Sequence, residues 1–193
     1  MIEQIDIINL SHYDLGFTDY PDVCAALQRD YIDRALALCR SNRRKGPGAR
    51  FCWTVESNAA LADWWAGAQR KKKIEFVHAV RSGWIEVCAL PFNKSAILNG
   101  PQWKTMARWL PEDLWRMVRP RVIMQNDVNG MQRAGVMALM DRGAEFLWMS
   151  INLDLGRSPL PQPGAFWWKM PDGRRIFVWI SISYPAGYFF FEP

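Results

Sequence analysis

The chain has 193 residues, 50% of them hydrophobic, which is enough for one buried core and short of what two ordinary domains need. Its net charge of +5 comes with two basic runs, Arg40–Lys45 and Arg70–Lys73. Each run follows an expected helix, whose carbonyl-rich end favours cations, and neither is interleaved with the aromatic residues on which nucleic-acid bases stack. We therefore interpret both runs as solvated helix ends and expect no nucleic-acid partner.

Cysteine spacing and the length of apolar segments bear on the location of the protein. The four cysteines lack metal-site spacing and lie in apolar patterns, which indicates buried thiols in a reducing compartment. The amino terminus has no secretory signal, and the longest apolar stretch, near Ile176–Ile182, is far shorter than the roughly 20 residues of a membrane-spanning helix. We expect a soluble, cytoplasmic protein with no membrane partner, and the sequence does not indicate its oligomeric state.

The first expected element is an apolar strand, Ile5–Leu10, which runs directly into His12 and Asp14. Residues two apart in an extended chain share one face, about 6 to 7 Å apart along the strand, so these two side chains can bind one ion. Gly16 then allows a sharp turn. A His-x-Asp pair is a weak signal by itself, because a hydrogen-bonded loop histidine is the more common case.

Strands and helices alternate along the rest of the chain. The segment Asp22–Arg40 predicts a helix that opens at Pro21, with Leu27, Tyr31, Ala35 and Leu38 as its apolar stripe. The following elements, in chain order, are a strand over Arg50–Glu56, helices over Ala59–Gln69 and Lys72–Val80, a strand over Trp84–Leu90, tandem helices within Gln102–Arg119, a strand over Arg121–Gln125, a helix over Gly130–Arg142, a strand over Glu145–Ser150, and strands over Ala165–Met170 and Arg175–Ser181 joined by a turn at Pro171–Gly173.

This alternation predicts an α/β fold with a parallel sheet, either a closed barrel or an open doubly wound sheet, in a single domain over residues 1–193. Both architectures gather functional groups at the carboxyl ends of their strands. Asp127 follows the strand Arg121–Gln125, so it falls at the same kind of position as His12 and Asp14. The alternative for Asp127 is a helix N-cap.

Three segments of the chain, read in order, resemble the motifs of a known family. They are His12-Tyr-Asp14-Leu-Gly16-Phe17, Asp127-Val-Asn129-Gly130, and Phe166-Trp-Trp168 followed by Asp172-Gly173. They resemble the His-x-Asp-x-Gly-Trp, Asp-x-Phe-Gly and Phe-x-Trp with Asp-Gly motifs of glycoside hydrolase family 38, the zinc-dependent retaining α-mannosidases. Their order and spacing agree along nearly the whole chain.

The resemblance implies a seven-stranded parallel (β/α) barrel of the glycoside hydrolase type, incomplete here at its carboxyl end. It implies one zinc ion held by His12, Asp14 and Asp127, with Asp127 also the catalytic nucleophile in hydrolysis of a carbohydrate substrate. The family's fourth zinc ligand, a histidine, and its acid/base aspartate are expected beyond Pro193. The aromatic run Gly187–Phe191 fits this expectation, because such a run is normally buried under later chain. The isolated chain is therefore expected to be inactive.

The chain departs from the family pattern at positions that we expect to contact the sugar. Phe17 and Asn129 replace a tryptophan and a phenylalanine, and Ala89-Leu-Pro-Phe92 stands where the family has Gly-Gly-x-Trp. We expect Phe17, Asn129 and Trp168 to contact substrate. Sugar identity and linkage stay open.

Other functions and residues stay open as alternatives. A metal-dependent carbohydrate deacetylase also uses histidine and carboxylates on a strand-end ion, and a non-catalytic sugar-binding relative would carry the same motifs. Glu56 can bind a hydroxyl or cap the next helix, and Asp154 can be an acid or a turn residue. His78 is interpreted as a half-buried helix residue, and most of the 11 tryptophans as core residues.

Overall fold

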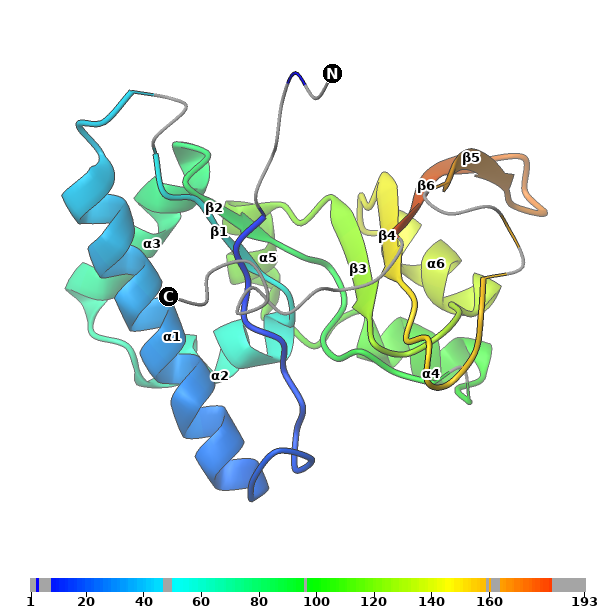
Figure 1. Ribbon diagram of the computed structural model, residues 1–193, viewed down its shortest axis with the longest axis horizontal. Helices are drawn as coiled ribbons and strands as arrows, with labels where there is room; N and C mark the ends of the chain where they lie inside the picture. The colour runs from blue at the N-terminus through cyan, green and yellow to red at the C-terminus, as the bar shows by residue number, and fades with distance from the viewer. Residues whose placement is uncertain are drawn as a thin grey trace. The chain divides into compact units, whose positions relative to one another are not determined.

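The structure is a computed structural model that describes residues 3, 8–46, 50–95, 97–158, 160 and 164–181. It divides the chain into two compact units (Figure 1). The first unit contains Met1–Phe92 and Arg108–Pro120, and the second contains Asn93–Ala107 and Arg121–Pro193. The expected strand residues 5–7 and the aromatic run 187–191 lie outside the described residues.

The first unit is built on two short parallel strands, β1 (Trp53–Val55) and β2 (Ile85–Val87). Leu10 adds an isolated parallel bridge to Thr54, and Asn9 O accepts a hydrogen bond from Thr54 N at 2.8 Å. The segment that leads to His12 therefore runs alongside β1 in the same direction. This places the residues after Leu10 and those after β1 at the same edge of the pairing.

Four helices complete the first unit: α1 (Pro21–Asn42), α2 (Asn58–Gly67), α3 (Arg70–Arg81) and α5 (Glu112–Val118). Pro21 stands at the first helical position of α1, as expected from its fixed φ. The apolar stripe expected for α1 is right at Ala35, which is 2% exposed, and wrong at Leu27 and Leu38, which are 43% and 45% exposed. The buried side is formed by Cys24, Gln28, Ile32, Ala35, Leu36 and Cys39.

The basic run Arg70–Lys73 lies at the beginning of a helix and not after the end of one. The residues Arg70–Lys73 were expected to follow a helix, but α2 ends at Gly67 and these residues form the first turn of α3. The expected helix over Ala59–Gln69 was therefore two residues too long, because Ala68 already has extended backbone angles. The four cations consequently lie at the positive end of a helix dipole, where cations are disfavoured.

The second unit is a four-stranded sheet in the order β3-β4-β6-β5. The strands β3 (Val122–Asn126), β4 (Phe146–Ser150) and β6 (Arg175–Ser181) are parallel, and β5 (Gly164–Lys169) is antiparallel to β6. The expected hairpin is confirmed: Gly173 has φ +86° in its turn, and Met170 N donates to Arg174 O at 2.8 Å. The buried residues of β6 alternate along the strand, as Ile176, Val178 and Ile180 show.

Two helices belong to the second unit, α4 (Gly100–Met106) and α6 (Arg133–Met140), and they pack against each other. A capping box between Asn99 and Gln102 begins α4. Gly135 permits the close packing, because a Cβ at this position would lie 2.8 Å from the ring of Trp103, which is 1% exposed. The helix α6 begins at Arg133 instead of Gly130, which has φ +86°.

The α/β class is confirmed, since parallel strands follow helices in both units. The described residues contain six strands in two sheets, one strand of them antiparallel. A seven-stranded parallel barrel goes beyond these strands and stays a prediction. Within the described parts of the chain, no helix combines the length and the apolar character needed to cross a bilayer.

Candidate functional site

His12 and Asp14 lie together in the first unit, just beyond the bridge at Leu10. His12 Nε2 is 3.2 Å from Asp14 Oδ1, and the two side chains are 20% and 28% exposed. Gly16, with φ +85°, then turns the chain toward α1. Both side chains are reachable from solvent and close enough to share one ligand.

Glu56 lies behind this pair at the end of β1 and is 2% exposed. Its Oε1 is 3.0 Å from His12 Nδ1, and its Oε2 accepts a hydrogen bond from Tyr13 N at 3.0 Å. Ser57, the residue before α2, donates its hydroxyl to Pro91 O. The sequence interpretation of Glu56 as a hydroxyl ligand or helix cap missed its contact with His12. The available signal was a carboxylate ending one strand beside a histidine ending its neighbour.

Both ring nitrogens of His12 face carboxylate oxygens, Asp14 on one side and Glu56 on the other. A neutral imidazole carries one N–H and one lone pair, so one of these contacts would oppose a lone pair to a negative oxygen. A second proton on the ring or a cation beside Nε2 removes this repulsion. One imidazole and carboxylate oxygens are donors that suit zinc, and a buried carboxylate behind the imidazole is the usual support of a metal ligand.

The backbone around His12 is fixed by polar and apolar contacts. Gln28 of α1 donates from Nε2 to His12 O at 3.0 Å and to Ser11 Oγ at 3.1 Å. Tyr13 is 8% exposed and packs in a small cluster with Cys24 and Ala60. Burial raises the pKa of Tyr13, so this phenol stays neutral near pH 7. The candidate ligands therefore stand on a segment held from both sides.

Asp127 belongs to the second unit and follows β3 directly. Its φ is +65°, in the left-handed region that aspartate and asparagine tolerate better than most residues. Asn152, after β4, donates from Nδ2 to Asp127 Oδ1 at 2.5 Å. The N-cap of α6 is Gln132, so the structure does not support the helix-cap alternative for Asp127. Its meeting with His12 and Asp14 stays a prediction.

Asn129 and Asn152 join the two loops that carry this carboxylate. Asn129 Oδ1 accepts from Asn152 N at 2.7 Å, and Asn129 Nδ2 donates to Asn152 O at 2.8 Å. Asn152 Oδ1 in turn accepts from Asp154 N at 2.8 Å. Asp154 therefore lies in an Asx turn in an exposed loop, in agreement with its interpretation as a turn residue.

The remaining candidates are solvent-accessible to different degrees. Phe17 is 89% exposed beside the turn at Gly16, and Trp168 is half-buried on β5. His78 is exposed on α3, not half-buried as expected, and its ring meets the Trp84 ring edge-on at 5.6 Å. Several tryptophans are core residues as expected, among them Trp64, Trp103 and Trp115.

Comparison with known proteins identifies a family model and similar folds. Residues 3–188 match the model described as "Glycosyl hydrolases family 38 N-terminal domain". An α-mannosidase from Enterococcus faecalis V583 is similar in structure, with TM-score 0.66 and 14% identity over 90% of this chain and 19% of that chain. A protein in glycosyl hydrolase family 38, also from Enterococcus faecalis, gives TM-score 0.57 and 13% identity over 89% and 18%.

A 4-α-glucanotransferase from Thermococcus litoralis gives TM-score 0.62 and 14% identity, over 94% of this chain and 28% of that chain. At these identities, the similarity shows the fold alone. The chain spans about a fifth of the length of the two Enterococcus faecalis proteins. No curated protein matches the sequence.

Proposed function

Because this chain belongs to glycosyl hydrolase family 38, we propose that it forms part of the catalytic domain of a metal-dependent retaining glycosidase of the α-mannosidase type. The observation that carries the proposal is His12, held between buried Glu56 and accessible Asp14. This geometry supports a metal site more directly than it supports a surface histidine. We further propose that residues 1–193 contribute to one (β/α) barrel domain.

The proposed ligands of a single zinc ion are His12, Asp14 and Asp127. Their nitrogen and oxygen donors fit zinc, and Glu56 contacts His12 Nδ1, so Nε2 would be the nitrogen that holds the ion. When bound, the ion would supply open coordination positions for neighbouring hydroxyl oxygens of a sugar. The contribution of Asp127 requires the two units to bring their loops together, which is part of the proposal.

Asp127 is the proposed nucleophile. One of its carboxylate oxygens attacks the anomeric carbon while the bond from that carbon to the leaving oxygen breaks, and a general acid protonates the leaving oxygen. Water then attacks the anomeric carbon, gives its proton to the same acid/base group and releases Asp127. Asn152 donates to Oδ1, which supports a fixed orientation of the carboxylate during attack.

The sugar is proposed to lie against Phe17, Asn129 and Trp168. Aromatic rings stack on the apolar faces of sugars, and the high exposure of Phe17 suits such a contact. Asn129 uses one Nδ2 proton for Asn152 O, and its second proton can donate to a sugar hydroxyl. We propose that the general acid and a fourth zinc ligand lie outside residues 1–193. A protein that contains this chain and those two residues is called the complete enzyme below.

A fluorinated aryl α-mannoside tests the nucleophile. In the complete enzyme, we expect a covalent sugar adduct on the peptide that contains Asp127, detected by mass spectrometry after digestion. Deacetylation of an acetylated sugar without any adduct would establish the deacetylase alternative instead. Sugar binding without either reaction would indicate a non-catalytic relative.

Two further measurements test the proposal as a whole. Hydrolysis of an aryl α-mannoside by the complete enzyme is expected to stop on chelation and to return with zinc. The isolated 193-residue chain is expected to show little turnover, because we propose that the general acid lies outside it. Equal turnover by the isolated chain and the complete enzyme would contradict this assignment of the acid.

A further inference from the structure

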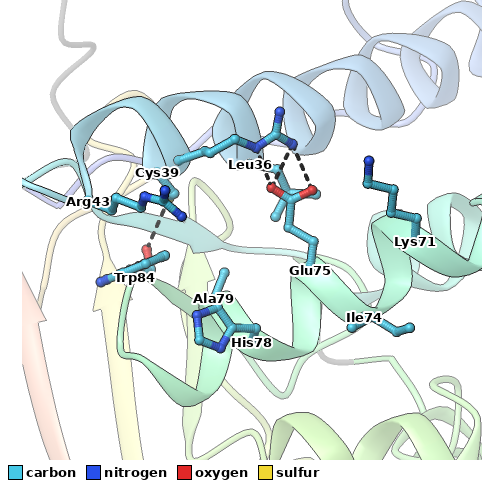
Figure 2. Close-up of a pocket in the computed structure, with 10 residues that line it drawn as sticks. Leu36, Cys39, Arg43, Lys71, Ile74, Glu75, His78, Ala79 and Trp84 are labelled. Carbon is cyan, nitrogen blue, oxygen red and sulfur yellow. Dashed lines mark hydrogen bonds and ion pairs between the residues drawn. The ribbon is translucent and has the colours of Figure 1, made fainter.

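A groove lies between α1 and α3 in the first unit, with a volume of about 540 Å³ (Figure 2). This is within the roughly 300 to 1,000 Å³ that small-molecule sites occupy. Its lining combines apolar and charged side chains, which come from α1, from α3 and from the residue just before β2. They are Leu36, Cys39, Arg40, Arg43, Lys71, Ile74, Glu75, His78, Ala79 and Trp84.

The floor of the groove is apolar. Leu36, Cys39 and Ala79 are 3%, 2% and 2% exposed, whereas Ile74 on the wall is 61% exposed. Burial raises the pKa of the Cys39 thiol to about 11, so the floor carries no charge near pH 7. An exposed isoleucine beside a hollowed apolar floor is surface that a ligand with an apolar body would cover.

The charges of the groove lie at its two ends, with an ion pair between them. Cys39 Sγ contacts Trp84 O at 3.8 Å, which places the end of α1, where Arg43 is the C-cap, near the carboxyl end of α3. Lys71 stands in the first turn of α3, eight residues before Ala79, or about 12 Å along the helix axis. Figure 2 shows Glu75 between Arg43 and Lys71, and Glu75 binds Arg40 through two hydrogen bonds of 2.7 Å.

Two neighbouring cations, Lys72 and Lys73, have partners within the unit. Lys72 Nζ is 2.6 Å from Asp33 Oδ2, and Lys73 Nζ lies 5.3 Å from the centre of the Trp65 ring. Among the residues that the structure describes, no acidic side chain lies within ion-pair distance of Arg43 or Lys71. Lys71 also stands at the positive end of the α3 dipole, where an anion would relieve an unfavourable placement.

We propose that this groove binds a small organic dianion with an apolar body and an acidic group at each end. The body lies over Leu36, Ile74 and Ala79, one acidic group meets Arg43, and the other meets Lys71. The two basic runs that are far apart in the sequence thus serve one ligand. This site is separate from the proposed chemistry of His12 and Asp14.

Titration calorimetry of the 193-residue chain with octanedioate tests the proposal. Octanoate has one carboxylate and 1,8-octanediol has none. Comparison of the three affinities therefore measures the contribution of the first and of the second carboxylate. We expect octanedioate to bind about fivefold more tightly than octanoate, as one partly exposed charge contact provides, and the diol to bind least. Equal affinity of octanedioate and octanoate would overturn the proposal. So would tight binding of an acidic peptide with no binding of octanedioate.

Three substitutions test the residues. Lys71→Gln should weaken octanedioate about fivefold and leave octanoate, docked at Arg43, nearly unchanged. The matched Lys73→Gln, on the same helix but outside the groove lining, should leave both affinities unchanged. Glu75→Gln should tighten octanedioate binding, because it removes the one carboxylate in the groove and releases Arg40. Weaker binding in Glu75→Gln, or equal losses in the two lysine variants, would refute this assignment.

Discussion

The two units hold their candidate carboxylates by different means. In the first, the buried carboxylate of Glu56, after β1, contacts the His12 ring and Tyr13 N, and Asp14 lies on the other side of that ring. In the second, Asp127 follows a strand end with φ +65°, and its Oδ1 accepts a hydrogen bond from Asn152 Nδ2. The first arrangement fixes the direction of a ring, and the second fixes the direction of a carboxylate. The first suits a histidine that holds a metal ion, and the second suits a carboxylate that acts as a nucleophile.

This difference suggests how each region responds to substitution. Glu56 uses one carboxylate oxygen for His12 and the other for Tyr13 N, so a change that removes either acceptor loses one of these contacts. A backbone support such as the turn at Asp127 survives any residue that accepts a positive φ. The second region should therefore tolerate an isosteric change structurally while losing its chemistry.

The largest effect is expected for Asp127→Asn in the complete enzyme. Asparagine accepts the same backbone angles, so the fold should persist, but the amide cannot attack the anomeric carbon. We expect kcat/KM for an aryl α-mannoside to fall at least about 10³-fold, measured by release of the aryl group. Asp154→Asn, in an exposed loop of the same unit, is the control and should retain activity. If Asp154→Asn lost as much activity as Asp127→Asn, the result would not support Asp127 as the nucleophile.

The next largest effect is expected for Glu56→Gln. Its amide can accept from His12 or from Tyr13 N, but its NH₂ group must then face a donor at the other contact. We expect zinc affinity to fall about 10- to 100-fold, measured by competition with a chromophoric chelator. Glu75→Gln, in the same unit but on α3, should leave zinc affinity unchanged. Unaltered affinity in Glu56→Gln would contradict its role behind His12.

Asn152→Ala should act more mildly, because the backbone still positions Asp127. Without the donor to Oδ1, the carboxylate gains rotational freedom, and we expect kcat to fall about tenfold with little change in KM. Asn152→Asp restores the shape but places a like charge beside Asp127, so it should not recover activity. Full activity in Asn152→Ala would show that Asn152 is not needed to orient the carboxylate.

The smallest effect is expected for Phe17→Ala. This side chain is 89% exposed, so its removal should leave thermal stability unchanged. If it stacks on the sugar, KM should rise about threefold while kcat stays nearly constant. Leu155→Ala, a change at another exposed apolar residue, provides the control. An unchanged KM would place the sugar away from Phe17.

Local signals in the sequence predicted the alternation of strands and helices well. The hairpin followed from the turn chemistry of Asp172-Gly173, which the structure confirms. The expected α1 stripe was only partly right, because polar Gln28 lies on the buried side while Leu27 and Leu38 are exposed. Successive residues of a helix point about 100° apart around its axis, so an error of one residue assigns the wrong face to the core.

The site was predicted only in part, for a physical reason. His12 and Asp14 are two residues apart, so strand geometry relates them, and the structure brings them together. Glu56 lies 44 residues from His12, and only the pairing beside Leu10 and Thr54 brings the two side chains into contact. Asn152 reaches Asp127 through the parallel register of β3 and β4. Such long-range contacts depend on strand order, which composition and periodicity do not specify.

The division of the chain has a consequence for how it can come apart. Its sequence crosses from one unit to the other at Phe92 to Asn93, at Ala107 to Arg108 and at Pro120 to Arg121. Neither unit is an uninterrupted stretch of polypeptide, so no single proteolytic nick can release either one whole. A nick after Phe92 would separate α3 from α5, the helix against which it packs. The two segments of each unit are joined through a segment of the other unit. Unfolding of one unit therefore loosens the connection within the other, and we expect the two units to unfold together.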